Sequence, residues 1–281
     1  MRRPDRLVPI GFGLAAALLV GFVLLPMAAV FVRVPLATLL SQLRSNAALG
    51  ALGVSLRTTA TSLAIILVLG TPAAYLLGTR SFRGAAALET VLEVPLVLPP
   101  AVAGIALLAA FGRFGLLGGT LRAAGIEVGL TPAAVVMALT FVAMPFYVRQ
   151  AVGAFASVDR QVLAASRTLG AGDGETFLRV AVPLARKGLS AGAALAFARA
   201  LGEFGATIMF AGNLQGRTQT LPLAIYGLYS ADNLPGALAL AALLVAVSVG
   251  LLVGVKVILR AGRTQGWEGW TASSRSTSGI V

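Results

Sequence analysis

The chain has 281 residues, of which 58 % are hydrophobic and 11 % are charged, and its mean hydropathy is +0.91. Soluble domains carry about a quarter charged residues, so this composition indicates an integral membrane protein. The formal net charge of +12 does not by itself indicate a nucleic-acid partner, because membrane proteins gather basic residues on their cytoplasmic loops. Cysteine and histidine are both absent, which excludes disulfides, thiolate nucleophiles and imidazole metal ligands. We therefore expect no catalytic residue, no metal site and no bound nucleic acid.

Apolar segments of about 20 residues predict six transmembrane helices. They lie near residues 8–32, 52–78, 90–111, 132–151, 188–210 and 236–259. The first segment is longer than the apolar core of a signal peptide, so we interpret it as a retained helix. The expected fold class is an all-α integral membrane protein with a single transmembrane domain over residues 1–262. We expect the short polar tail at 263–281 to be disordered.

Most of the 22 basic residues fall on one side of the predicted bundle. That side holds the arginines of the N-terminus, Arg80, Arg83 and the basic residues of a polar loop at 160–187. Because positive charge is retained on the cytoplasmic side of membrane proteins, both termini are predicted to be cytoplasmic. The same orientation places the polar loop in the cytoplasm.

Three prolines, Pro95, Pro99 and Pro100, interrupt the third predicted span. Proline lacks a backbone N–H and clashes with the preceding turn, so we expect no regular helix through this segment. Carbonyl groups freed at membrane depth are tolerated where protein or a water-filled cavity satisfies them. The segment is either a gate beside a transport pathway or a kinked packing helix, and its residues leave both interpretations open.

The stretch from Ala164 to Leu184, AASRTLGAGDGETFLRVAVPL, is a polar segment between two long apolar ones. It carries Gly170 near its centre and Pro183 near its end. A membrane protein seldom keeps a polar loop of this length without docking it on something. We expect a cytoplasmic partner to bind this loop.

The fifth predicted span contains Arg199 and Glu203, which are four residues apart and would share one helix face. Opposite charges at that spacing can neutralise each other at membrane depth. The pair either braces helix packing or lines a pathway. Thr207 and the polar residues after it either offer neutral hydrogen-bond donors to an anion or form an ordinary loop.

The polar loop resembles the EAA loop of ATP-binding-cassette (ABC) importer permeases. Ala164 and Ser166 stand where the family usually has the leading Glu and the second Ala, while Gly170 and Pro183 keep the family spacing. The stretches at 95–118 and 196–226 resemble the molybdate permeases of that family, and the sulfate permeases are close relatives.

This resemblance implies a type I importer permease that carries molybdate, and tungstate as its near isostere, by alternating access. Sulfate or thiosulfate is the alternative substrate. The implied assembly is a homodimer in the lipid of the bacterial inner membrane, with two cytoplasmic ABC ATPase subunits and an extracytoplasmic oxyanion-binding protein. The residues implied to couple the permease to the ATPase are Arg167, Thr168, Leu169, Gly170, Ala171, Gly172 and Asp173.

The chain contains no Walker A sequence, so we expect ATP and Mg²⁺ to bind the partner ATPase and no cofactor to bind this chain. Two other classes of protein fit the sequence less well. An autonomous secondary transporter or channel would need coupling carboxylates, and only Glu93 and Glu203 lie within the predicted spans. A membrane-embedded enzyme would need a nucleophile or a metal cluster, which this composition does not supply.

Overall fold

The computed structural model describes residues 7–264, and within that range every regular element is a helix. Five helices are long and apolar enough to cross a membrane, and one bent pair of helices makes a sixth crossing if it is counted as one span. The crossing helices are α1 (Leu7–Val32), α3 (Asn46–Thr79), α7 (Pro132–Ala156), α10 (Val182–Leu201), α13 (Leu234–Thr264) and the bent pair of α4 (Ala85–Val97) with α5 (Pro100–Phe111). The predicted all-α membrane fold is confirmed. The tail predicted at 263–281 lies almost wholly outside the described residues.

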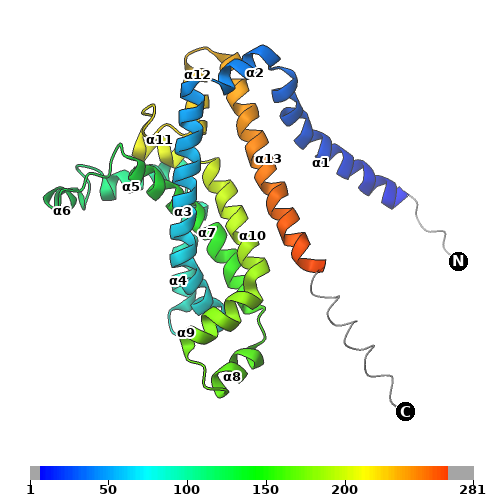
Figure 1. Cartoon of the computed structure of the whole chain (residues 1–281), viewed down its shortest axis with the longest axis vertical. Coiled ribbons are helices and arrows are strands. Elements are labelled where there is room, and N and C mark those ends of the chain that lie inside the picture. The colour runs from blue at the N-terminus through cyan, green and yellow to red at the C-terminus, as the bar shows by residue number, and fades with distance from the viewer. Residues whose placement is uncertain (1–6, 265–281) are drawn as a thin grey trace.

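Helix α7 forms the centre of the bundle and packs against α3 and α10 (Figure 1). Small residues make these contacts close: a Cβ atom on Gly70 of α3 would lie 3.0 Å from the Tyr147 ring. Two hydrogen bonds also join α3 to α7, from Thr140 to Ser62 at 3.0 Å and between the hydroxyls of Thr71 and Tyr147 at 2.6 Å. Buried hydroxyl groups are thereby satisfied between helices where water is excluded.

Helix α1 stands apart from this bundle, and its main contact is with α13 (Figure 1). None of its described side chains is buried. Two short helices, α2 (Leu36–Leu43) and α12 (Leu221–Ser230), pack on α13 at one end of the molecule. Sequence reasoning predicted neither short helix, because both are shorter than a membrane span.

The third predicted span is broken, as expected, but not at the first proline. Helix α4 continues through Pro95 to Val97, and the chain then turns by 114° before α5 begins at Pro100. Pro95 supplies no backbone N–H to α4, and the helix ends only two residues later. The helix passes Pro95, and the expected interruption of the span lies at Leu98 and Pro99.

The fifth predicted span, 188–210, is also not one helix. Helix α10 ends at Leu201, Gly202 and the two residues after it leave helical geometry, and a short helix, α11 (Gly205–Ala211), follows. Glycine is a weak helix former, and the side chain of Glu203 bonds to the first turn of α11 instead of continuing α10. Arg199 and Glu203 therefore do not share one helix face.

The polar loop folds into short elements at the end of the molecule opposite α2 and α12 (Figure 1). They are α8 (Arg160–Thr168), α9 (Asp173–Glu175) and a π-helix, η1 (Thr176–Ala181), that leads directly into α10. The loop at 112–131 contains one further short helix, α6 (Gly118–Ala123).

Candidate functional site: a broken-helix junction and a polar loop

The two broken helices pack against each other at their breaks. A Cβ atom on Gly104 of α5 would lie 2.6 Å from the carbonyl oxygen of Ala206, and one on Gly205 would lie 2.9 Å from Cβ of Pro100. Real Cβ atoms do not approach so closely, so only glycine allows α5 and α11 to touch through their backbones. We call the contact of α5 with α11, together with the turn at 202–204, the broken-helix junction.

Glu203 is the buried charge of this junction. Its side chain is 1 % exposed, and one carboxylate oxygen lies 2.6 Å from Nη1 of Arg199, whose side chain is 26 % exposed. The other oxygen accepts a hydrogen bond of 2.8 Å from the backbone N–H of Ala206. The guanidinium of Arg199 also lies 5.9 Å from the ring centroid of Phe146 on α7. Glu203 thus caps α11 and ties it to the end of α10.

The other predicted pathway residues divide between the junction and α4. Pro99 precedes α5 and Pro100 is its first residue, where proline costs no backbone hydrogen bond. Thr207 lies in α11 and is fully buried, and its hydroxyl has no hydrogen-bond partner within the described part of the chain. Pro95 is buried in α4, which packs on α7, so it does not belong to the junction.

The polar loop is built around one left-handed turn. Asp159 caps the N-terminus of α8 by accepting a hydrogen bond of 2.8 Å from Gln161 N–H. After α8, Gly170 adopts a φ of +91°, which a residue with a side chain takes only at a cost. Backbone bonds from Gly170 N to Arg167 O and from Ala171 N to Ser166 O then close the turn at 3.0 and 3.1 Å. Of the seven residues implied to couple to the ATPase, Arg167 and Thr168 end α8, and the others form this turn and the start of α9.

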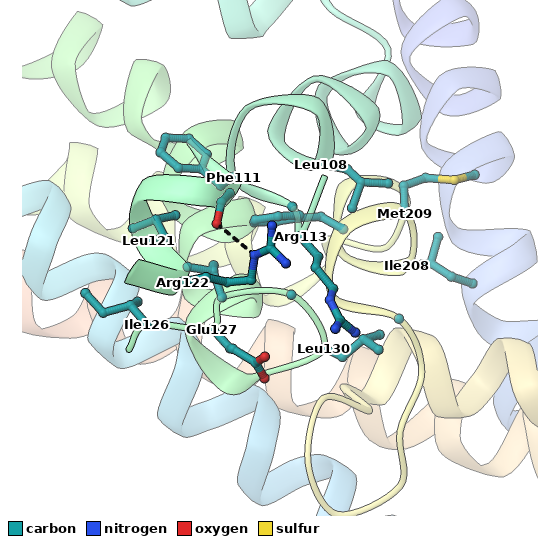
Figure 2. Close-up of a pocket in the computed structure, with 16 residues that line it drawn as sticks. Leu108, Phe111, Arg113, Leu121, Arg122, Ile126, Glu127, Leu130, Ile208 and Met209 are labelled. Carbon is teal, nitrogen blue, oxygen red and sulfur yellow. Dashed lines mark hydrogen bonds between the residues drawn. The ribbon is translucent and has the colours of Figure 1, made fainter. Parts of the chain in front are cut away.

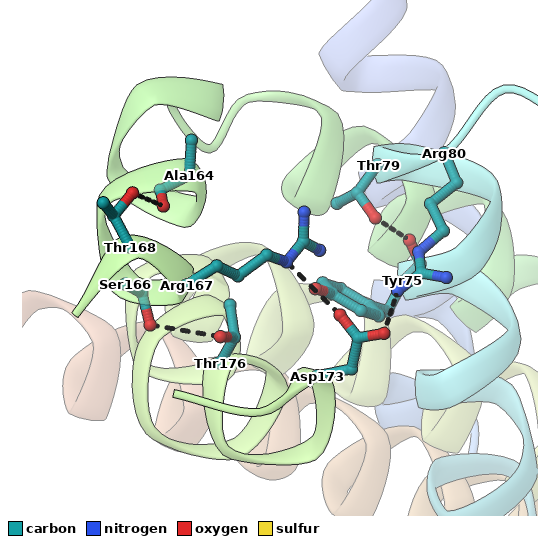
Figure 3. A network of polar contacts seen from close by, with 9 residues as sticks. All are labelled: Tyr75, Thr79, Arg80, Ala164, Ser166, Arg167, Thr168, Asp173 and Thr176. Carbon is teal, nitrogen blue, oxygen red and sulfur yellow. Dashed lines mark hydrogen bonds and ion pairs between the residues drawn. The ribbon is translucent and has the colours of Figure 1, made fainter. Parts of the chain in front are cut away.

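Asp173 links the polar loop to the end of α3 (Figure 3). Its carboxylate lies 2.8 Å from Nη2 of Arg80 and 3.2 Å from Nε of Arg167. Hydrogen bonding and attraction from Arg80, with a smaller contribution from Arg167, hold the pKa of this exposed carboxyl below its ordinary value. Ser166 and Thr176, whose hydroxyls are 3.1 Å apart, join α8 to η1 in the same region. The sequence did not predict the ion pair of Arg80 with Asp173, because these residues are far apart in the chain.

Leu169, in the same turn as Gly170, is 89 % exposed. It lies on the rim of a groove of about 420 Å³. The groove is lined by Val162, Ala165, Ser166, Leu169, Ala171, Glu175, Arg179 and Val180. An exposed leucine beside an apolar groove is a feature of docking surfaces.

The fold is that of the ABC importer permeases. The structure superposes with a TM-score of 0.73 on a chain of a bacterial alginate ABC transporter. That crystal structure also contains an alginate pentasaccharide-bound periplasmic protein. The match covers 92 % of this chain and 96 % of that one at 13 % sequence identity.

Residues 67–261 match the family described as the binding-protein-dependent transport system inner membrane component, and the chain belongs to this family. It is 44 % identical over 236 residues to the molybdenum transport system permease protein ModB of Mycobacterium tuberculosis, which covers 83 % of this chain and 88 % of that protein. It is also 40 % identical over 185 residues to sulfate permease 2, chloroplastic, of Chlamydomonas reinhardtii, which covers 66 % and 50 % of the two chains.

Proposed function

We propose that this chain is the permease subunit of an ATP-driven importer of molybdate, with tungstate as a second substrate. The observation that carries the proposal is the 44 % identity to a molybdenum permease over 83 % of the chain. Sulfate is the second candidate, because the sulfate permease of Chlamydomonas is 40 % identical over a shorter stretch. Two copies of the chain would enclose the pathway, with two ABC ATPase subunits in the cytoplasm and an oxyanion-binding protein outside.

In this proposal the polar loop is the contact with the ATPase. Leu169 and the groove beside it offer an apolar surface for the partner, while the carboxylate of Asp173 holds the loop on Arg80 at the end of α3. A displacement of α8 by the ATPase would therefore be passed to α3 through the ion pair and to α10 through η1. ATP and Mg²⁺ would bind the partner, and this chain would contribute no catalytic group.

The broken-helix junction is the proposed gate. Helices α5 and α11 meet backbone to backbone. The turn at Leu98–Pro99 joins α5 to α4, and the turn at 202–204 joins α11 to α10. Such turns can absorb a change of backbone angle while the helices move as rigid bodies. Pro99, Pro100 and Thr207 would then lie next to the moving parts, and the Arg199–Glu203 pair would fix the angle between α10 and α11.

The proposed orientation places both chain termini and the polar loop in the cytoplasm. It is supported by the distribution of basic residues, and Figure 1 places the end of α13 toward the same end of the molecule as α8. We propose that residues 1–262 form a single permease domain, of which the family match covers residues 67–261.

The proposal is tested by uptake of labelled molybdate into liposomes that contain this chain and its co-purified ATPase. Uptake should require ATP together with the binding protein, and excess sulfate should not compete. Uptake driven by an ion gradient without ATP would favour a secondary transporter and would contradict the proposal.

A further inference from the structure

A cavity of about 450 Å³ lies between the outer ends of α5 and α11, where it adjoins the broken-helix junction (Figure 2). Helix α6 and the segment 126–130 complete its wall. The large apolar side chains of the wall include Leu108, Phe111, Leu121, Ile126, Ile208 and Met209. A ligand of this cavity must therefore have a substantial apolar part.

Three charged side chains line the same cavity: Arg113, Arg122 and Glu127 (Figure 2). All three are exposed, and within the described residues no ion pair of 4.0 Å or less joins Glu127 to either arginine. Arg122 is positioned by a bond of 3.4 Å from its Nε to the carbonyl oxygen of Gly118. The cavity thus presents two cationic groups and one anionic group that remain available to a ligand.

The backbone that carries Arg113 is folded tightly onto α5. Leu116 and Leu117 donate backbone bonds of 2.9 Å to the carbonyls of Ala109 and Ala110. A Cβ atom on Gly115 would lie 2.5 Å from the Ala109 oxygen, so the turn admits only glycine there. Leu130, also in the wall, is held at a φ of +58°, a conformation that residues other than glycine rarely adopt. A preformed wall lowers the entropic cost of binding.

The surroundings of the cavity favour a lipid over a free inorganic anion. Phe114 and Leu116 beside it are 92 % and 89 % exposed, as expected of side chains that meet the membrane interface. A small oxyanion would lose hydration against the apolar wall and would leave the Glu127 carboxylate without a cationic partner of its own. A phospholipid with an ammonium-bearing head group matches all of these groups at once.

We propose that this cavity binds a zwitterionic phospholipid of the phosphatidylethanolamine type. The phosphate accepts hydrogen bonds from Arg113 and Arg122, since planar guanidinium groups suit phosphate oxygens. The lipid ammonium group meets the Glu127 carboxylate, and the first part of the acyl chains lies on Ile208 and Met209. The bound lipid would then lie against α5 and α11 at the outer end of the junction.

The test measures lipid binding by the full-length permease purified in detergent. The protein is titrated with phosphatidylethanolamine, phosphatidylglycerol or inorganic phosphate, and native mass spectrometry counts the ligand that it retains. Wild type should bind phosphatidylethanolamine best and should not retain inorganic phosphate. The double variant Arg113→Gln, Arg122→Gln should bind both lipids about tenfold more weakly or worse, because it loses charged hydrogen bonds to phosphate. Arg44→Gln, an equivalent change of an exposed arginine after α2, should bind as wild type does.

Glu127→Gln is a second variant, which tests recognition of the lipid ammonium group. It should remove the preference for phosphatidylethanolamine over phosphatidylglycerol while leaving affinity for the shared phosphate intact. Unchanged lipid binding by the double arginine variant, or displacement of lipid by millimolar inorganic phosphate or molybdate, would overturn the proposal. The measurement involves no transport, so its result is independent of whether molybdate is the substrate.

Discussion

Glu203 is the residue on which the broken-helix junction depends most. A carboxylate that is 1 % exposed is tolerated only because Arg199 neutralises it and the N–H of Ala206 bonds to it. Arg199 is less constrained, since its side chain is 26 % exposed and reaches the face of Phe146. The two members of the pair therefore respond differently to substitution.

We predict that Arg199→Ala is more damaging than Glu203→Gln. Removing the arginine leaves a buried carboxylate without its cation, a change that costs about 3–5 kcal/mol in buried pairs. The glutamine variant keeps an oxygen that can accept from Ala206, and the arginine that remains can reach water. Thermal unfolding of both variants in detergent would check the order. A glutamine variant that melts as early as the alanine variant would argue against this account.

Residue spacing predicted that Arg199 and Glu203 can neutralise each other, but not how they do it. The pattern i, i+4 assumes a continuous helix, whereas the bond forms across the end of α10. The contact of Asp173 with Arg80 has no spacing signal, because α3 and α9 meet only in the folded molecule. The sequence also did not predict the cavity lined by Arg113, Arg122 and Glu127, because its wall forms only in the folded molecule.

At the scale of elements, the contact of α5 with α11 leaves no room for a side chain. Gly104 is the critical position, because the nearest atoms around an added Cβ are the backbone of Ala206 and cannot move independently of α11. Gly53 in α3 has no atom within 4 Å of the same position and serves as a matched control.

We predict that Gly104→Ala lowers transport and reduces stability by about 1–3 kcal/mol, the range for overpacked contacts. Gly53→Ala should leave both unchanged or stabilise α3 slightly, because alanine is the better helix former. Uptake assays and thermal unfolding would separate the two variants. Equal activity of Gly104→Ala and Gly53→Ala would show that the junction is not a close contact during transport.

The polar loop gives a second test at this scale. Asp173→Asn removes both ion pairs that hold the loop, whereas Glu89→Gln removes an exposed carboxylate of α4 that forms no ion pair within the described residues. We predict that the asparagine variant hydrolyses ATP with less uptake per ATP, because movement of α8 no longer reaches α3. The glutamine variant should keep the wild-type ratio of uptake to hydrolysis. A wild-type ratio in Asp173→Asn would contradict the role given to this ion pair.

Hydropathy predicted the long helices well and the broken ones poorly. Spans such as α7 and α13 follow from runs of apolar residues bounded by polar ones. The break after Leu201 lies inside such a run. It is accompanied by the hydrogen bond from Ala206 N–H to Glu203, and averaged hydropathy cannot detect a single hydrogen bond. The two short helices α2 and α12 were missed for a related reason, since neither is long enough to register as a span.

For the whole molecule, the orientation in the membrane can be tested directly because the chain has no cysteine. A single cysteine at exposed Ser157, which precedes α8, should react with a membrane-impermeant thiol reagent only from the cytoplasmic side. A cysteine at exposed Thr120 in α6 should react only from outside. Labelling of intact cells and of inverted vesicles would check both, and the reverse pattern would place the polar loop where no ATPase can reach it.

In the proposed importer, transport depends on coupling between this permease, an ATPase and an oxyanion-binding protein. The most direct measurement is ATP hydrolysis by the reconstituted complex in liposomes, with the binding protein supplied empty or loaded with molybdate, tungstate or sulfate. We predict that the protein loaded with molybdate or tungstate stimulates hydrolysis and that the protein presented with sulfate does not. Stimulation by sulfate alone would keep the mechanism and contradict the substrate, and a permease that assembles with no ATPase would contradict the importer itself.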